Sequence, residues 1–270
     1  MKRVFLATLL VLTQFAHSQN DTLVLNYYAR TPFSFAENGV AKGIEVDIMN
    51  EFILWLKTKK KIDIQFRYQE FSDYQAFYSA TKNGSKNTIG LGSTTVSQEK
   101  LKEVDFTSTY LKNVAFCITN GNAPDVKTKN ADEIVRALGS MNAHTIPNTS
   151  LNKYVSEIKK NYVHDLRVVF QPDEVKILDE VARNVLAFGY VDAIGFWFYV
   201  KNNPHRFLKM QKILSQSREE MGFIVPKGSR YKQLFDEFFS GTAGFRTSPA
   251  YRGILERYLG SYMTQNVAVN

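Results

Sequence analysis

The sequence predicts an α/β protein made of two β/α units. Segments with the alternating pattern of strands are followed by segments with the apolar spacing of helices, and this order occurs twice along the chain. Such an order is typical of mostly parallel sheets covered by helices. Apolar residues make up 44% and aromatic residues 13% of the 270 residues, which is enough for packed cores and excludes a disordered chain.

The first unit has the order strand, helix, strand, helix, strand. The expected strands are residues 22–28, 62–68 and 88–91. The expected helices are residues 45–57 and 71–82. Residues 30–39 contain Pro32 and are expected to form a loop. Glu45 and Asp47 lie in the first turn of a helix, where we expect their charges to favour the helix dipole.

The second half of the chain repeats the pattern more loosely and adds two helices at its end. The expected strands are residues 114–119, 141–146, 166–170, a segment within 187–199, and 221–225. The expected helices are residues 130–138, 150–161, 173–184, 229–240 and 249–259. Two β/α units in one chain indicate a cleft between them, and small ligands bind in such clefts.

Residues 1–18 have the layout of a secretory signal peptide. Two basic residues precede an apolar run over residues 4–15, and Ala16 and Ser18 place small side chains before a cleavage site. The run is shorter than the roughly 20 residues that span a bilayer, which disfavours the alternative of an N-terminal membrane anchor. We therefore expect a cleaved leader and a mature protein in the periplasm.

The charge and the cysteine content exclude several classes of protein. The net charge is +8, and it falls to +6 without Lys2 and Arg3. The basic excess is spread along the chain, so we do not expect nucleic-acid binding. Cys117, the only cysteine, lies in an apolar run and is expected to be a buried hydrophobe rather than a nucleophile. The four histidines show no metal-ligand spacing, and we expect no metal, cofactor or catalytic residue.

Four stretches of the sequence together resemble one family of binding proteins. The stretches are Tyr28–Asp47 with Pro32-Phe33 and GIEVD, GSTTVSQEKLKEVDFTSTY at residues 92–110, GYVDA at residues 189–193, and the strand, Pro-Lys-Gly and helix of residues 222–235. With these stretches in this order, the chain resembles the bacterial extracellular solute-binding proteins of family 3, which bind polar amino acids.

The resemblance implies a two-lobed type II periplasmic-binding-protein fold with two crossover hinge strands near Asn113 and Glu220. Lobe 1 would consist of residues 19–112 and 218–270, and lobe 2 of residues 113–217. Closure about such a hinge would enclose a ligand between the lobes.

The resemblance also implies a site for a ligand carboxylate. The family binds this group with an arginine and with donors of a Ser/Thr-rich loop, because a guanidinium suits a planar carboxylate. In this chain Lys100 stands at the position of the arginine, and Ser93, Thr94 and Thr95 form the loop. Lysine keeps the charge but lacks the planar fork, so the exchange weakens the inference to an α-amino acid.

Other positions of the expected cleft depart from the family. Arg30 stands where the family often has a stacking aromatic residue, and it is either a partner for an anionic group or a solvated loop residue. Trp197 stands where the family has an aspartate for the ligand's amine. The ligand then either lacks an α-ammonium or rests a cation on an aromatic face, unless Trp197 packs in the core. Tyr28 and Phe33 are candidates for an apolar wall, although Phe33 also fits the core.

In the second lobe, Thr149 and Ser150 match a family loop at a helix start. A helix N-terminus offers free N–H groups to an anion, and the same residues also serve as helix caps. Together with Arg30 and Lys100, this loop makes a cleft with more positive than negative groups. We therefore expect a ligand with at least one carboxylate or similar anion.

These observations predict a periplasmic solute-binding protein that is not an enzyme. We expect a monomer that captures a small polar solute, an amino acid or a related compound, for uptake through an inner-membrane ABC permease. One alternative is a binding protein that reports to a membrane sensor instead of a transporter. Another is an enzyme resembling the cyclohexadienyl dehydratases, with Asp192 or Glu219 as the acid. A structural or adhesive module, which needs no cleft chemistry, is the third.

Overall fold

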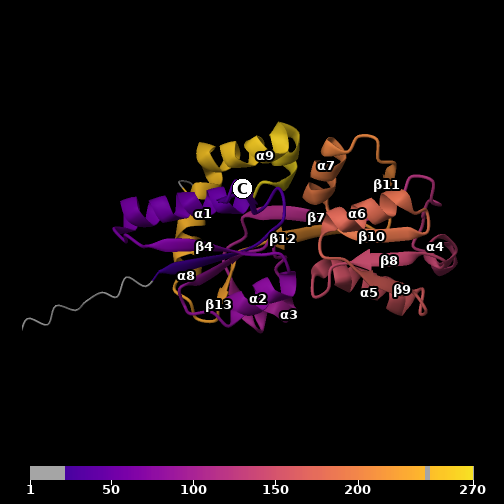
Figure 1. Ribbon diagram of the computed structural model, residues 1–270, viewed down its shortest axis with the longest axis horizontal. Coiled ribbons are helices and arrows are strands. Elements are labelled where there is room, and N and C mark those ends of the chain that lie inside the picture. The colour runs from indigo at the N-terminus through magenta and orange to yellow at the C-terminus, as the bar shows by residue number, and fades with distance from the viewer. Residues whose placement is uncertain (1–21, 241–243, 270) are drawn as a thin grey trace, which may run out of the picture.

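The computed structural model describes residues 22–240 and 244–269 and has two lobes joined by a pair of strands (Figure 1). The predicted signal peptide at residues 1–18 lies outside the described residues. Within the described part of the chain, no helix combines the length and the apolar character that crossing a membrane requires.

The first lobe contains a five-stranded sheet with the order β4-β1-β5-β13-β6. The strands are β1 (Leu23–Tyr28), β4 (Phe66–Phe71), β5 (Thr88–Leu91), β6 (Val104–Phe106) and β13 (Ile224–Pro226). Strand β1 is parallel to β4 and β5, and β13 is antiparallel to β5 and β6. A small hairpin of β2 (Phe35–Glu37) and β3 (Val40–Lys42) follows β1.

Helices cover both faces of the first sheet. They are α1 (Ile44–Trp55), α2 (Tyr74–Lys82), the short α3 (Gln98–Leu101), α8 (Tyr231–Phe239) and α9 (Pro249–Val267). Leu23 and Leu25 of β1 pack with α1, α8 and α9, whereas Tyr28 packs with α2. Successive side chains of a strand point to opposite faces, so one strand serves both layers.

The second lobe contains a sheet with the order β11-β7-β10-β8-β9, and β12 pairs with β7. The strands are β7 (Leu111–Asn120), β8 (Asn142–Thr145), β9 (Arg167–Phe170), β10 (Ala187–Asp192), β11 (Leu208–Met210) and β12 (Gln216–Met221). The helices are α4 (Ala131–Leu138), α5 (Ser150–Asn161), α6 (Glu174–Arg183) and α7 (Ala193–Asn202).

Strands β7 and β12 connect the lobes (Figure 1). They pair antiparallel from Leu111 with Met221 to Ala115 with Gln216, with an irregularity between Ser217 and Glu219. The expected two-lobed α/β architecture with two crossover strands is therefore confirmed. The residue-level boundaries, 112/113 and 217/218, fall within these two strands and stay a prediction.

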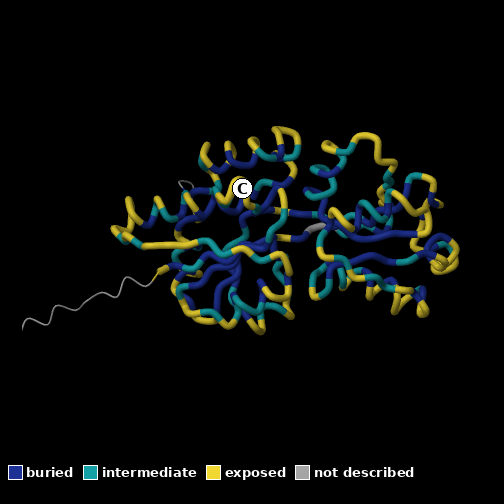
Figure 2. The backbone as a smooth tube through the Cα atoms, in the orientation of Figure 1, coloured by how far each residue is buried: buried dark blue, intermediate teal, exposed yellow. Residues whose placement is uncertain are grey.

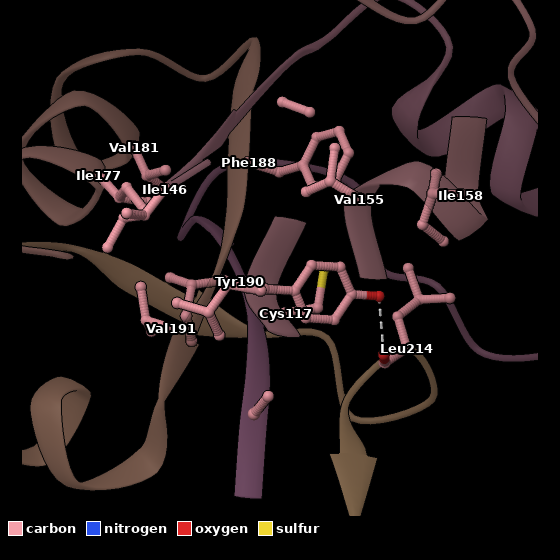
Figure 3. Close-up of a cluster of buried hydrophobic side chains, with 14 of the residues drawn as sticks. Cys117, Ile146, Val155, Ile158, Ile177, Val181, Phe188, Tyr190, Val191 and Leu214 are labelled. Carbon is pink, nitrogen blue, oxygen red and sulfur yellow. Dashed lines mark hydrogen bonds between the residues drawn. The ribbon is translucent and has the colours of Figure 1, made fainter. Parts of the chain in front are cut away.

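The core of the second lobe surrounds Tyr190 (Figure 3). The Tyr190 hydroxyl donates a hydrogen bond to the backbone oxygen of Leu214 at 2.9 Å. Cys117 lies beside this ring and is fully buried, and burial raises the pKa of its thiol to about 12. In both lobes the central strands are buried and the outer faces of the helices are exposed (Figure 2).

Several element boundaries differ from those expected from the sequence. The expected strand 62–68 begins only at Phe66, because α1 continues as a π-helical turn over Leu56–Lys60 that ends at the left-handed Lys61. The expected strand 221–225 is divided, because Gly222 bonds to the Thr94 backbone and the chain passes there from one sheet to the other. Helix α9 continues beyond residue 259 across a kink at Gly260, where φ is 73°.

An aromatic stack is central to the first lobe and leads to a stability prediction. The rings of Phe52 and Phe235 stack with centroids 3.8 Å apart, and neither residue is exposed. Phe235→Ala should therefore lower the free energy of unfolding by about 3–5 kcal/mol. Leu54→Ala, at a 53% exposed position of α1, should change it by no more than about 0.5 kcal/mol.

Urea unfolding followed by tryptophan fluorescence measures both variants, since Trp55 stacks on Phe52. Equal losses of stability in Phe235→Ala and Leu54→Ala would contradict the assignment of this stack as the core.

Candidate functional site

A cavity of about 20 Å³ lies between the lobes. Its lining residues are Tyr28, Arg30, Tyr74, Gly92, Ser93, Thr94, Thr95, Lys100, Ile146, Thr149, Ser150, Leu151 and Asp192. A space of this volume holds about one water molecule. In this arrangement of the lobes, side chains therefore fill the space around Arg30 almost completely.

The cavity-lining residues follow the carboxyl ends of parallel strands. Arg30 comes after β1, Ser93 after β5 and Thr149 after β8, and Asp192 is the last residue of β10. The carboxyl ends of parallel strands meet at one edge of a sheet, and ligands of open α/β sheets bind outside that edge. Each lobe thus presents its binding edge to the other lobe.

A larger groove of about 1030 Å³ adjoins the cavity. Thr95, Lys100, Thr149 and Ser150 line both the cavity and the groove. These four residues, two from each lobe, mark the place where the groove meets the cavity.

The Ser/Thr loop after β5 is held by a buried carboxylate. Ser93 has a left-handed backbone with φ 42°, and its N–H donates to Glu45 Oε1 at 2.8 Å. The hydroxyl of Tyr110 donates to the same oxygen at 2.5 Å, and that of Ser34 donates to Oε2 at 2.9 Å. Glu45 is fully buried, and burial raises its pKa although these three bonds oppose the rise.

Glu45 thus does more than the helix-dipole role expected of it from the sequence. Its place in the first turn of α1 is as predicted, but its side chain points inward and fixes the loop that carries Ser93. The sequence offers no signal for this role, because an acidic residue in a first helical turn is common on exposed helices as well.

Lys100 enters the cavity from α3. Its ammonium donates to the Tyr74 hydroxyl at 3.0 Å and lies 5.3 Å from the centre of that ring. Among the residues that the structure describes, no carboxylate forms an ion pair with Lys100. Its charge faces the cavity and the groove without a counter-ion from the chain.

Arg30, in contrast, is paired with groups on both sides of the cavity through both of its terminal nitrogens, while its buried Nε has no hydrogen-bond partner among the described residues. Its Nη2 lies 2.5 Å from Glu174 Oε2 and also contacts Asp192 Oδ2, both in the second lobe. Its Nη1 donates to Ser93 Oγ at 2.6 Å in the first lobe. Burial lowers the pKa of Arg30, but the charges of Asp192 and Glu174 outweigh that effect, so the pKa is raised.

The two carboxylates are positioned by the second lobe itself. The N–H of Asp192 donates to Glu174 Oε1 at 2.7 Å, and Asn113 donates to Asp192 Oδ1 at 2.5 Å and to Glu219 Oε2 at 3.1 Å. Tyr154 donates to the other oxygen of Glu219. Burial raises the pKa of Glu174 and of Glu219.

Sequence reasoning did not select Glu174 or Asn113 for the site. Glu174 follows the N-cap Asp173 of α6 and has the appearance of an ordinary first-turn residue. Asn113 was expected only as part of a hinge strand. Their roles depend on partners that are far away in the sequence.

Thr149 and Ser150 stand at the start of α5, as expected. Thr149 caps the helix, since its Oγ1 accepts from the Asn152 N–H at 3.3 Å and donates to the Ile146 oxygen at 2.7 Å. Ser150 Oγ lies 3.3 Å from Thr95 Oγ1 of the other lobe. Capping and a position on the cavity therefore occur together.

Phe33 and Trp197 do not line the cavity. Phe33 is fully buried in the first lobe, and the guanidinium of Arg30 lies 4.8 Å from the centre of its ring. Trp197 lies on α7 in a separate groove of about 800 Å³ beside the hinge, where Lys201 lies 5.0 Å from its ring. Trp197 packs against the core cluster of the first lobe. This agrees with the alternative, stated from the sequence, that Trp197 packs in the core and does not contact a ligand.

No group of three or more metal-ligating side chains comes together anywhere in residues 22–240 and 244–269.

Known proteins resemble this chain over most of its length. The family described as bacterial extracellular solute-binding proteins, family 3, has a model that matches residues 24–261. No curated protein matches the chain.

Solved structures with the same fold include several binding proteins. The arginine-, lysine-, histidine-binding protein ArtJ from Geobacillus stearothermophilus is 18% identical with a TM-score of 0.71, over 89% of this chain and 96% of that one. The GluR0 ligand-binding core from Nostoc punctiforme, in complex with L-glutamate, is 15% identical with a TM-score of 0.70, over 88% and 99%. The ancestral protein AncCDT-1, a precursor of cyclohexadienyl dehydratase, is 15% identical with a TM-score of 0.65, over 88% and 94%. These likenesses show the type II periplasmic-binding-protein fold.

The buried carboxyl of Glu45 leads to a prediction about pH. Because burial raises the pKa of Glu45 in the folded state, the wild type loses stability as the pH rises above the ordinary value of a glutamate. Glu45→Gln cannot ionise, so the stability advantage of the wild type over this variant should shrink as the pH rises above about 4.5. The change in this difference cannot exceed about 1.4 kcal/mol for each pH unit.

Thermal unfolding of both proteins at a series of pH values measures the difference. Glu256→Gln, at an exposed position of α9, controls for the loss of one charge. A difference between wild type and Glu45→Gln that stays constant with pH would show that the Glu45 environment does not disfavour its charged form.

Proposed function

The chain belongs to the bacterial extracellular solute-binding proteins, family 3, and on this premise we propose that it captures a small polar solute with a carboxylate group between its two lobes. The solute enters through the groove and binds where Thr95, Lys100, Thr149 and Ser150 meet. Binding proteins of this family hold solutes without transforming them, and we assign the chain the same role.

The observation that carries this proposal is the difference between the two cations of the cavity. Arg30 is neutralised by Glu174 and Asp192. Among the described residues, the ammonium of Lys100 has only the neutral hydroxyl of Tyr74 as a polar partner. Lys100 is partly buried, and a partly desolvated charge without a counter-ion gains free energy when it is paired, so a solute that brings a carboxylate to Lys100 is favoured.

Hydroxyl groups complete the proposed carboxylate site. An ammonium is a point charge and does not bind both carboxylate oxygens in the way a guanidinium does. The hydroxyls of Thr95 and Ser150 lie on either side of the boundary between the lobes. We assign them to the second carboxylate oxygen, which would join the two lobes through the solute.

Binding inside the cavity, beyond the part of the site that the groove reaches, requires the lobes to move apart and close again. The cavity has room for about one water molecule, which is too little for any carboxylate solute. Contacts that cross the boundary include Tyr28 with the Pro172 oxygen at 2.6 Å and Lys153 with Glu99 at 3.4 Å. Such polar contacts re-form readily in water, so we place the opening motion at β7 and β12.

We further propose a periplasmic location and delivery of the solute to an inner-membrane ABC permease. Family membership supports an extracellular or periplasmic role. A membrane sensor is the alternative partner, and it requires the same cleft. Neighbouring genes for a permease and an ATPase favour uptake, whereas a neighbouring kinase or cyclase gene favours sensing.

A dehydratase is the second candidate function, and Glu219 favours it. This residue lines the groove, and burial raises its pKa, so the carboxyl can hold a proton for use as a general acid. Asp192, the other candidate acid, is already paired with Arg30. Incubation of the protein with cyclohexadienyl carboxylates tests this alternative by measuring the loss of water from the substrate. Turnover by the wild type that Glu219→Gln abolishes would establish a dehydratase, and no turnover by the wild type would reject it.

The carboxylate site leads to a prediction about Lys100. Thermal shift with matched sets of monocarboxylates, dicarboxylates, amino acids and cationic amines should show stabilisation only by solutes with a carboxylate. Lys100→Met should weaken the binding of such a solute by about 10- to 100-fold in calorimetry, because a hydrogen bond to a charged group contributes about 1.5–3 kcal/mol.

Lys102→Met is the matched control, since Lys102 is exposed two residues further along and lines neither the cavity nor the groove. It should leave the affinity unchanged. Stabilisation by cationic amines alone, or equal effects of the two lysine variants, would contradict the proposal.

A further inference from the structure

We infer that Arg30 fills a cation-binding subsite of the interlobe cavity from within the chain, so that the protein selects carboxylates without an ammonium group over α-amino acids. The selectivity rests on the proposed function, because it requires a solute at Lys100. The subsite itself depends only on Arg30 and its partners, and it can be tested without any solute.

The subsite is built from both lobes. Glu174 and Asp192 converge on one nitrogen of the guanidinium, and Ser93 accepts from another. The side chains of Arg30, Glu174 and Asp192 are 10%, 5% and 4% exposed. Both carboxylates are also held by other donors, so they are oriented whether or not Arg30 is present.

The surroundings are shaped for a planar cation. Gly195 of α7 is adjacent: a Cβ there would overlap Glu174 Oε2 and lie 3.8 Å from Arg30 Nη2. The ring of Phe33 lies against the guanidinium. The Arg30 backbone is fixed by a tight turn in which the N–H groups of Phe33 and Ser34 donate to its oxygen.

Occupation by Arg30 leaves no carboxylate of the described cavity lining free for a cation of the solute, and Glu219 of the adjoining groove is already bound by Tyr154 and Asn113. Among the described residues that line the cavity, Asp192 is the only carboxylate, and it is bound by Arg30 and Asn113. An α-amino acid would have to place its ammonium in the same small space as Arg30 and Lys100, where like charges repel. The corresponding 2-oxo acid brings the carboxylate to Lys100 without this penalty.

Removal of Arg30 should therefore open the subsite to an external cation. In Arg30→Ala two buried carboxylates lose their counter-ion, which destabilises the fold. Guanidinium chloride at low millimolar concentration should raise the Tm of this variant relative to equal sodium chloride, whereas urea, a neutral molecule of the same shape, should not. The wild type should show no rise with either compound.

A matched control uses an arginine of the second lobe. Arg206 pairs with Asp179 at 3.9 Å on the exposed surface, so Arg206→Ala should not respond to guanidinium. Should Arg30→Ala yield no folded protein, Arg30→Gln keeps the stem of the side chain and allows the same comparison. A Tm of the Arg30 variants that guanidinium leaves unchanged or lowers, relative to equal sodium chloride, would overturn the subsite.

The selectivity is measured separately on the wild type with a matched pair of solutes. 2-Oxoglutarate should bind at least about 10-fold more tightly than L-glutamate in calorimetry, and Arg30→Gln should reduce this ratio. Equal or tighter binding of L-glutamate by the wild type would overturn the selectivity. If guanidinium raises the Tm of the Arg30 variant but the wild type binds no carboxylate, the subsite is upheld and the proposed function is rejected. If the wild type binds carboxylates but guanidinium does not raise the Tm of the variant, the proposed function is upheld and the subsite is rejected.

Discussion

The ion pairs of Arg30 with Glu174 and Asp192 are the interaction on which the rest of the site depends. They join residues of different lobes inside a space from which water is largely excluded. In such surroundings neither the guanidinium nor the carboxylates can remain unpaired without a large cost in free energy. The pairing therefore holds the lobes in their present arrangement, and it also occupies Asp192, the carboxylate of the described cavity lining.

This pairing divides the cavity into two chemically different parts. Around Arg30, every charge already has a partner, supported by Asn113 and by the backbone of Asp192. Around Lys100, a positive charge and several hydroxyls face the groove, and no described carboxylate forms an ion pair with Lys100, although glutamates that have other partners, among them Glu99 and Glu219, line the same groove. The second part is where a solute can add an interaction that the protein lacks, which is why an anionic solute suits this cleft.

Local pattern predicted much of the fold, and the reason lies in periodicity. Strand β5 and helix α5 begin and end at the expected residues, because their apolar spacing is unambiguous and turns or caps bound both. The boundaries of β4 and β12 were wrong, since a π-helical extension and a change of sheet leave no mark in a hydrophobic pattern. The family resemblance located the Ser/Thr loop, Lys100 and the start of α5, which the structure brings together.

The sequence by itself determined the α/β class, the order of the elements and the loops that reach the cleft. These features follow from local spacing and from motifs of a few consecutive residues. Only the tertiary structure decided that Arg30 is paired rather than free, that Glu45 and Glu174 point inward, and that Trp197 lies beside the hinge. Arg30 and Asp192 are 162 positions apart. A pairing of that kind depends on how two lobes meet in space, and no local pattern carries that information.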